Sequence, residues 1–109
     1  INFQDILLNN SFIFKGAIAE NFVAQTFRAN EISLYYWRSK NTAEIDFLLY
    51  NNDGIIPVEV KASDNTKSKS LNYYMEIYKP KYGIRLSTKN FGFENSIKSI
   101  PIYATFLIK

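Results

Sequence analysis

The sequence predicts a domain of the mixed α/β (α+β) class, in which helices flank a mixed central sheet. Its 109 residues are enough to bury one hydrophobic core and leave no room for a second large unit. Apolar residues make up 47% and aromatic residues 17%, a composition that is typical of globular proteins rather than disordered ones. Along the chain, the apolar residues follow first a helical period and then a strand period.

The first predicted element is a helix over residues 11–29, a stretch without proline in which apolar residues recur at helical spacing. Glu20 points along the centre of an apolar face of this helix, and Ile18 and Phe22 form a second apolar stripe on the opposite side. Because such a helix is usually covered on both sides, we expect another part of the protein to lie over it. The residues within about 60° of Glu20 are Ile13, Gly16, Val23, Ala24 and Phe27.

Three strands are predicted next, over residues 33–38, 43–50 and 55–62. The first is rich in aromatic residues, and the other two alternate between apolar and polar residues. The polar run 51–54 predicts a tight turn between the second and third strands. The alternation in the second strand places Ala43, Ile45, Phe47 and Leu49 on one face and Glu44, Asp46, Leu48 and Tyr50 on the other.

The second half predicts one more helix and two more strands. A polar stretch over 63–66 leads into a helix over 68–78, and a break at Pro80 and Gly83 frames a strand over 82–87. The last apolar run, 100–108, favours a strand because it is rich in β-branched and aromatic residues. The order of helix, three strands, helix and strands predicts the α+β class.

The complete absence of histidine and cysteine excludes several kinds of active site. A Ser-His-Asp triad, a cysteine nucleophile, a thiol redox centre and a zinc site with nitrogen or sulfur ligands all need one of these residues. An enzyme with this sequence has carboxylates, lysine, tyrosine, hydroxyl groups or an oxygen-bound metal to work with. A secreted scaffold held by disulfides is excluded as well.

The net charge of +3 hides an uneven distribution. Residues 1–59 carry four basic and seven acidic side chains, whereas residues 60–109 carry nine basic and three acidic ones. A basic half can bind phosphate backbones, and it is equally typical of a solvated, lysine-rich surface. No apolar run is long enough to span a bilayer and no signal peptide is visible, so we expect a cytoplasmic location.

The predicted turn at 51–54 fixes the register of a hairpin. If Tyr50 pairs with Ile55, Asp46 lies opposite Glu59 and Glu44 opposite Lys61, all on one sheet face. Two facing carboxylates repel each other unless a cation compensates for them. Hard oxygen ligands suit Mg²⁺ or Mn²⁺, which polarises a phosphoryl oxygen and lowers the pKa of a bound water. A lysine beside the metal can orient that water or stabilise charge on the phosphate.

These residues carry a resemblance to the PD-(D/E)xK nuclease superfamily, in which a helix glutamate, a strand aspartate and an E-x-K motif form the site. Within it, the chain resembles the restriction-endonuclease-like domain of unknown function that lies C-terminal to a AAA+-type ATPase module in bacterial and archaeal proteins. Ile45 stands where the superfamily has a proline before the aspartate. The matching segments are Gly16–Val23 around Glu20, Tyr36–Lys40, Glu44–Phe47, Pro57–Lys61 and Ile100–Tyr103.

The resemblance implies an α-β-β-β-α-β core and an Mg²⁺- or Mn²⁺-dependent nuclease, that is, a candidate endonuclease acting on DNA. Asp46 and Glu59 would bind the metal together with the carbonyl of Val60, Lys61 would position the water, and Glu20 would complete the acidic shell. The start at Ile1 agrees with this resemblance. We therefore expect residues 1–109 to be the C-terminal, nuclease-like part of a longer polypeptide whose N-terminal ATPase domain is a partner.

Several alternatives stay open on the sequence alone. Asp46 and Glu59 can be an exposed pair, Lys61 can simply neutralise Glu44, and Glu20 can face solvent if the helix is rotated. The aromatic residues of the first strand are more often core residues than platforms for bases. At the level of function, the alternative is a catalytically inactive module of the same fold that binds nucleic acid or another protein. A regulatory domain of a toxin or stress system is a third possibility.

Overall fold

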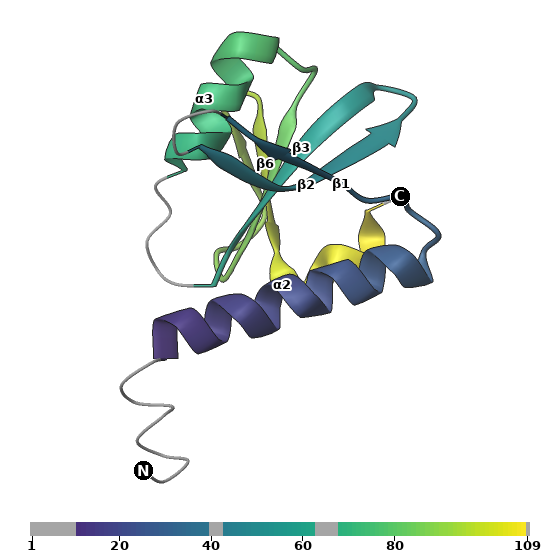
Figure 1. Ribbon diagram of the computed structural model, residues 1–109, viewed down its shortest axis with the longest axis vertical. Helices are drawn as coiled ribbons and strands as arrows, with labels where there is room; N and C mark the ends of the chain where they lie inside the picture. The colour runs from purple at the N-terminus through teal and green to yellow at the C-terminus, as the bar shows by residue number, and fades with distance from the viewer. Residues whose placement is uncertain (1–10, 40–42, 63–67, 109) are drawn as a thin grey trace, which may run out of the picture.

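The structure is a computed structural model that describes residues 11–39, 43–62 and 68–108, with side chains from Gly16 onward. The predicted polar stretch at 63–66 and Lys40 lie outside these residues. Strands and helices follow one another in the predicted α-β-β-β-α-β order (Figure 1). The elements are α2 (Ser11–Ala29), β1 (Tyr35–Arg38), β2 (Glu44–Asn51), β3 (Gly54–Lys61), α3 (Lys69–Tyr78), β4 (Gly83–Ser87), β5 (Gly92–Glu94), β6 (Ile97–Pro101) and the 3₁₀ helix η1 (Ile102–Leu107).

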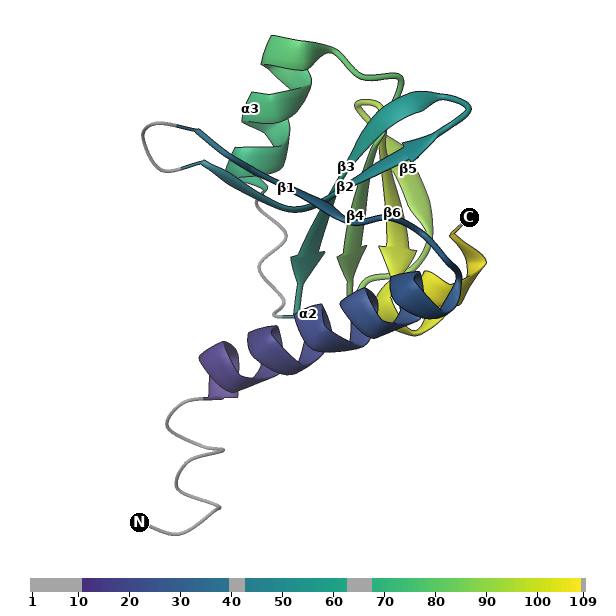
Figure 2. The ribbon, with the colours of Figure 1, turned by 45° about the vertical axis from the view of Figure 1, so that its right-hand side comes forward.

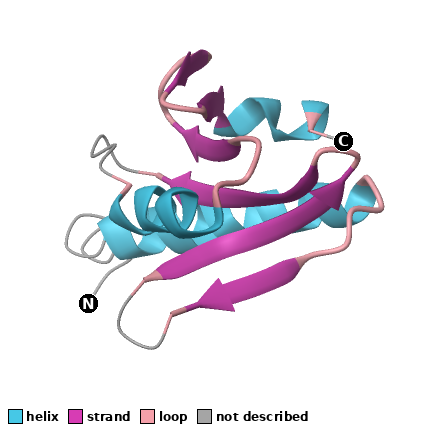
Figure 3. Cartoon of the chain, turned by 90° about the horizontal axis from the view of Figure 1, so that it is seen from above, coloured by secondary structure: helices cyan, strands magenta, loops and turns pink. Residues whose placement is uncertain are grey.

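The six strands form one mixed sheet in the order β1-β2-β3-β4-β6-β5. Strands β3, β4 and β6 are parallel to one another, and the remaining neighbours are antiparallel. Helices α2 and α3 lie on opposite faces of the sheet, and Figure 3 shows α3 in front of it and α2 behind it. Figure 2 shows η1 beside the C-terminal half of α2. The mixed α+β class with flanking helices is therefore confirmed.

Each sheet face carries its own hydrophobic cluster. On the face of α2, the cluster combines helix residues such as Val23 and Phe27 with Ile56, Val58 and Val60 of β3. On the face of α3, Leu71 and Tyr74 pack with Ile45 and Ile97. Because Val58 and Val60 point toward α2, the residues between and after them, Glu59 and Lys61, point toward α3.

The predicted hairpin register is confirmed over the end of the hairpin that lies next to the turn. Residues 47–51 of β2 pair with residues 54–58 of β3, including the predicted pair Tyr50 and Ile55. Gly54 has a φ of 100°, which glycine adopts without the strain that a side chain would cause. Gly54 is the first residue of β3 and pairs with Asn51, so Asn52 and Asp53 form the connection between the two strands.

Beyond this end of the hairpin, the predicted alternation of β2 is wrong. Strand β1 pairs Tyr35 with Leu48 but Trp37 with Ile45, so Asp46 and Phe47 together lie opposite Tyr36 in a β-bulge. The bulge reverses the faces: Ile45 packs on the side of α3, whereas Phe47 and Leu49 belong to the side of α2. Ile45 and Phe47, predicted to share one face, lie on opposite faces.

The C-terminal run is a strand only at its beginning. The strand β6 covers Ile97–Pro101, and residues 102–107 form a 3₁₀ helix instead of the predicted strand. The ring of Pro101 removes a ladder donor, and the Thr105 hydroxyl donates to the Ile102 carbonyl at 2.5 Å, which stabilises the turn. The sequence analysis also missed the short edge strand β5.

The predicted bounds of the first helix are confirmed, and its second apolar stripe is exposed. Ile18 and Phe22 are 55% and 44% exposed, although Val23 and Phe27 on the other side are fully buried. Among the described residues, no helix has both the length and the hydropathy to cross a membrane.

Candidate functional site

Glu59 is the most deeply buried acidic residue of the described chain, with 6% of its surface exposed. Its strand places it on the α3 face, where its Oε1 lies 3.7 Å from the Nζ of Lys61. Burial raises the pKa of Glu59, and the side chain of Ser68 and the charge of Lys61 oppose this rise. The prediction that Glu59 and Lys61 share a face is confirmed.

Asp46 lies in the β-bulge, at the point where the pairing of β2 with β3 stops. Its Oδ2 accepts a hydrogen bond of 2.8 Å from the backbone N–H of Val60. The side chain thus replaces a backbone partner that the diverging strand no longer supplies. Burial raises the pKa of the Asp46 carboxyl, although the bond from Val60 lowers it.

Glu20 reaches Asp46 from helix α2. The two carboxyl groups are close enough for each to change the pKa of the other. Burial raises the pKa of Glu20, and the charge of Asp46 raises it further. Glu20 was predicted along the centre of the apolar face of the helix, but it is exposed, whereas Val23 and Phe27 are buried.

The predicted arrangement of four residues on one face is wrong. Because Ile45 points toward α3, its neighbours Glu44 and Asp46 point toward α2, while Glu59 and Lys61 point toward α3. The side chains of Asp46 and Glu59 therefore lie on opposite faces of the sheet, at the point where the pairing of β2 with β3 ends. They remain close enough for the charge of Asp46 to raise the pKa of Glu59.

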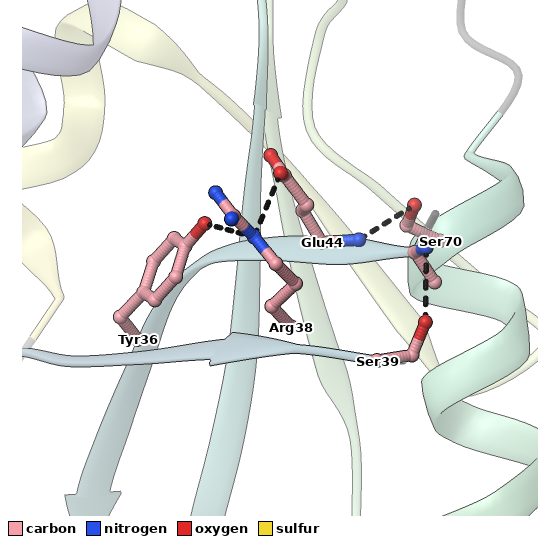
Figure 4. A network of polar contacts seen from close by, with 6 residues as sticks. Tyr36, Arg38, Ser39, Glu44 and Ser70 are labelled. Atoms are coloured by element: carbon pink, nitrogen blue, oxygen red, sulfur yellow. Dashed lines mark hydrogen bonds and ion pairs between the residues drawn. The ribbon is translucent and has the colours of Figure 1, made fainter. Parts of the chain in front are cut away.

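Glu44 has a different partner from the one predicted. Its Oε1 lies 3.0 Å from the Nε of Arg38, which also donates to the Tyr36 hydroxyl at 2.9 Å (Figure 4). The backbone N–H of Glu44 donates to the hydroxyl of Ser70 on α3 at 3.2 Å. Both Arg38 and Glu44 are largely exposed. This ion pair lies on β1 and β2 at the edge of the sheet. Lys61 is therefore paired with Glu59 and not with Glu44.

The family model described as "Domain of unknown function (DUF4143)" matches residues 15–105. The chain belongs to this family. The match extends from α2 into η1 and contains every residue predicted for the site: Glu20, Asp46, Glu59, Val60 and Lys61. No curated protein and no solved structure matches the chain.

The acidic residues of this DUF4143 domain offer a partial fit to a hard cation. The available donors are carboxylates and the Val60 carbonyl, and oxygen ligands are the ones that Mg²⁺ and Mn²⁺ prefer. The Oε2 atom of Glu59 is buried and has no hydrogen-bond partner in the described part of the chain, as expected of an oxygen that a cation satisfies. However, within residues 11–39, 43–62 and 68–108, no three acidic side chains form a group that can hold a metal.

Two residues that the sequence analysis did not single out complete the surroundings of Glu59. Arg85 of β4 pairs in register with Glu59 across the parallel strands β3 and β4. Its Nε donates to the hydroxyl of Ser68 at 2.6 Å, and the side chain of Ser68 lowers the pKa of Glu59. A polar serine directly before a helix is the signal of an N-cap, but nothing in the sequence indicates that β4 lies beside β3.

Proposed function

We propose that this chain is a nuclease-like domain of the PD-(D/E)xK type that hydrolyses phosphodiester bonds, with DNA as the substrate. The proposal rests on the buried side chain of Glu59. Its Oε1 is paired with Lys61, whereas its Oε2 has no hydrogen-bond partner among the described residues. Burying a carboxylate oxygen without a partner is costly, and it is expected where the oxygen has to bind a cation.

In this proposal Glu59 and Asp46 hold Mg²⁺ or Mn²⁺ together with the carbonyl of Val60. The bound ion supplies Lewis-acid polarisation of the phosphate and a more acidic water. Lys61, held beside Glu59, orients the attacking water and stabilises negative charge on the phosphate. Glu20 lies near Asp46, and burial and the charge of Asp46 raise the pKa of its carboxyl group.

The test is cleavage of supercoiled, linear and single-stranded DNA by the purified protein with Mg²⁺, Mn²⁺ or EDTA. Glu59→Gln and Lys61→Met are the site variants, and Lys89→Met, an exposed lysine on a turn, is the matched control. We expect metal-dependent cleavage that falls by about 10²-fold or more in both site variants and stays unchanged in the control. Equal cleavage by the wild type, Glu59→Gln and Lys61→Met would sink the proposal.

A second candidate is a non-catalytic module that binds nucleic acid or another protein. It is favoured by the lack of a three-ligand acidic group among the described residues and by the engagement of Asp46 with Val60 and Glu20. Calorimetric titration with Mn²⁺ separates the two candidates. Absence of binding at millimolar Mn²⁺, with and without DNA, selects the non-catalytic module.

The partnership with an N-terminal AAA+-type ATPase domain of the same polypeptide is also part of this proposal. The exposed apolar stripe of α2 supports it, since Ile18 and Phe22 are large side chains that a neighbouring domain would cover. Cysteine labelling at position 18 measures the accessibility of the stripe. We expect slower labelling in the polypeptide that includes the ATPase than in the 109-residue chain.

A further inference from the structure

A cavity of about 570 Å³ lies between the chain that follows α2 and the end of β2. Its volume falls within the range of ~300–1,000 Å³ that is typical of sites for small molecules. Strand β1 begins at Tyr35, which pairs with Leu48, so residues 49–51 of β2 extend beyond the start of β1. The cavity is lined by these residues and by residues 30–33, and it therefore lies where the chain from α2 has not yet joined the sheet.

The charge of the cavity lining is negative. Glu31 is the single charged residue among the described residues that line the cavity, and within the described chain it has no ion-pair partner. Arg28, the basic residue in the last turn of α2, does not line the cavity. The last carbonyl groups of a helix carry partial negative charge, which adds to the charge of Glu31. A cavity with these charges favours a cation.

Glu31 occupies a backbone position that favours glycine. Its φ of 59° lies in the left-handed region, where a side chain is strained. Its N–H donates to the carbonyl of Arg28, and the N–H of Ile32 donates to that of Phe27, which are the two bonds of a Schellman motif. Glycine is the usual residue at this point of the motif, and strained residues tend to cluster at binding and catalytic sites. The carboxylate at the end of α2 is thus present at a cost in stability.

Two tyrosines line the same cavity, and their side chains have no partners in the described part of the chain. Tyr35 is 58% exposed and Tyr50 is 74% exposed. Neither ring stacks on another described aromatic ring. The faces of such rings attract ammonium and guanidinium groups. A metal ion such as Mg²⁺ or Ca²⁺ instead needs several oxygen ligands, which one carboxylate does not supply.

We propose that this cavity binds an organic cation, an ammonium or guanidinium group, with Glu31 as its charge partner and Tyr35 and Tyr50 as aromatic walls. Such a group is found both on a free amine and on a lysine or arginine side chain of another protein. The inference is independent of the proposed nuclease site, since neither Glu59 nor Lys61 lines the cavity.

The test is an NMR titration of the 109-residue chain in which the ring resonances of Tyr35 and Tyr50 are followed. The probes are butylammonium, butylguanidinium and neutral butanol, and two capped tripeptides, Ala-Lys-Ala and Ala-Met-Ala, represent a protein partner. Glu31→Gln and Tyr50→Leu are the site variants. Their matched controls are Glu76→Gln, an exposed carboxylate on α3, and Tyr103→Leu, a tyrosine that is 71% exposed on η1.

We expect the two cations to shift both tyrosine resonances with a Kd on the order of 1 mM, and butanol to leave them unchanged. Glu31→Gln should raise the Kd by about 3- to 5-fold and Tyr50→Leu by about 2- to 5-fold. The two controls should bind as the wild type does. If the lysine peptide binds more tightly than butylammonium, the natural cation is a side chain of a protein; if butylammonium alone binds, it is a free amine.

Glu31→Gly separates binding from stability. Because glycine adopts the left-handed region without strain, this variant should melt higher than the wild type by roughly 2–5 °C and yet bind the cations as weakly as Glu31→Gln. Three results would overturn the inference. They are resonances that do not move with either cation up to tens of millimolar, butanol binding as tightly as butylammonium, and undiminished cation binding by Glu31→Gly.

Discussion

Asp46 illustrates how one side chain serves both the sheet and the candidate site. Its Oδ2 accepts the bond from Val60 N–H where the backbone of β2 has moved away, so the carboxylate repairs the end of the ladder. The same group raises the pKa of Glu20 on α2. A loss of activity after substitution of Asp46 is therefore ambiguous unless folding is measured as well.

Substitutions at Asp46 should separate these two roles. Asp46→Ala leaves the Val60 N–H without an acceptor, and a buried donor of this kind costs about 1–3 kcal/mol. Asp46→Asn keeps an oxygen that can accept the bond, so it should cost clearly less stability. Urea unfolding of both variants checks this. Equal free energies of unfolding for the two variants would show that the bond to Val60 is not what Asp46 contributes.

The Glu20 and Asp46 pair should also make stability depend on pH. The pKa of Glu20 is raised from its ordinary value of 4.5, chiefly by burial and then by Asp46, so the folded protein holds the proton more tightly than the unfolded chain. Stability contributed by this group is then present at low pH and is lost as the pH rises through the raised pKa. The charged form is the one that folding disfavours.

Replacing Glu20 by glutamine should remove this penalty. In buffer with EDTA at pH 7.5, we expect Glu20→Gln to melt higher than the wild type by roughly 2–5 °C, and the difference should shrink toward pH 5. Glu76→Gln, which removes one exposed carboxylate from α3, controls for the change in net charge. A lower melting temperature of Glu20→Gln at pH 7.5 would contradict a raised pKa of Glu20 in the folded protein.

Most of the candidate site is predictable from sequence because period-two alternation and an E-x-K spacing are local properties. They correctly place Glu59 with Lys61. Helical periodicity places Glu20 among the buried residues of α2, but Glu20 is exposed and interacts with Asp46. Ser68 and Arg85 escape such reasoning because their contact joins the start of α3 to a strand beside β3. That neighbour relation is set by the chain topology, and one sequence does not reveal it.

At the level of elements, the hairpin of β2 and β3 marks the limit of what local patterns predict. The turn fixes the register of residues 47–51 against 54–58, as expected from its polar composition. The β-bulge at Asp46 and Phe47 arises where β2 also has to follow β1. Since a single extra residue reverses the faces of everything beyond it, the predicted face of Asp46 was wrong although the turn was right.

Replacement of two glycines by alanine should change the stability of the protein in opposite directions. A Cβ at Gly16, inside α2, meets no atom within 4 Å, whereas a Cβ at Gly83 meets Met75 Sδ at 3.0 Å and Leu71 Cδ1 at 3.2 Å. We expect Gly16→Ala to stabilise the protein by about 0.5–1 kcal/mol, because alanine favours helix. Gly83→Ala should destabilise it by about 1–3 kcal/mol, since α3 packs closely on the start of β4.

Thermal and urea unfolding of both variants measure these changes. Gly92→Ala is the control in a strand, because its Cβ has only one neighbour, at 3.8 Å. A destabilising Gly16→Ala would mean that this face of α2 is more tightly covered than the described contacts indicate.

The whole molecule consists of two helix layers that share one sheet. The cluster under α2 and the cluster under α3 lie on opposite faces of the same strands, so each layer depends on a sheet that the other stabilises. The candidate site lies between these layers, with Glu20 reaching in from α2 and Ser68 from the start of α3. A shared sheet predicts that the two layers unfold together.

Leu71→Ala tests this cooperativity. Leu71 is fully buried on the face of α3, and its truncation should cost about 2–5 kcal/mol. The only tryptophan, Trp37, packs edge-on against Tyr74 of α3 with ring centroids 5.1 Å apart, so its fluorescence reports the α3 layer. Far-UV circular dichroism reports both helices, with the larger contribution from the 19-residue α2 on the other face and the smaller from the 10-residue α3.

We expect the fluorescence and circular dichroism transitions of Leu71→Ala to shift to lower urea by the same amount and to remain coincident. Ile77→Ala, at a position of the same helix that is 49% exposed, should shift neither of them appreciably. If fluorescence changes at lower urea than the helix signal, the α3 layer opens alone. Glu59 would then lose Ser68 while Glu20 still contacts Asp46, and the two halves of the candidate site would be separable.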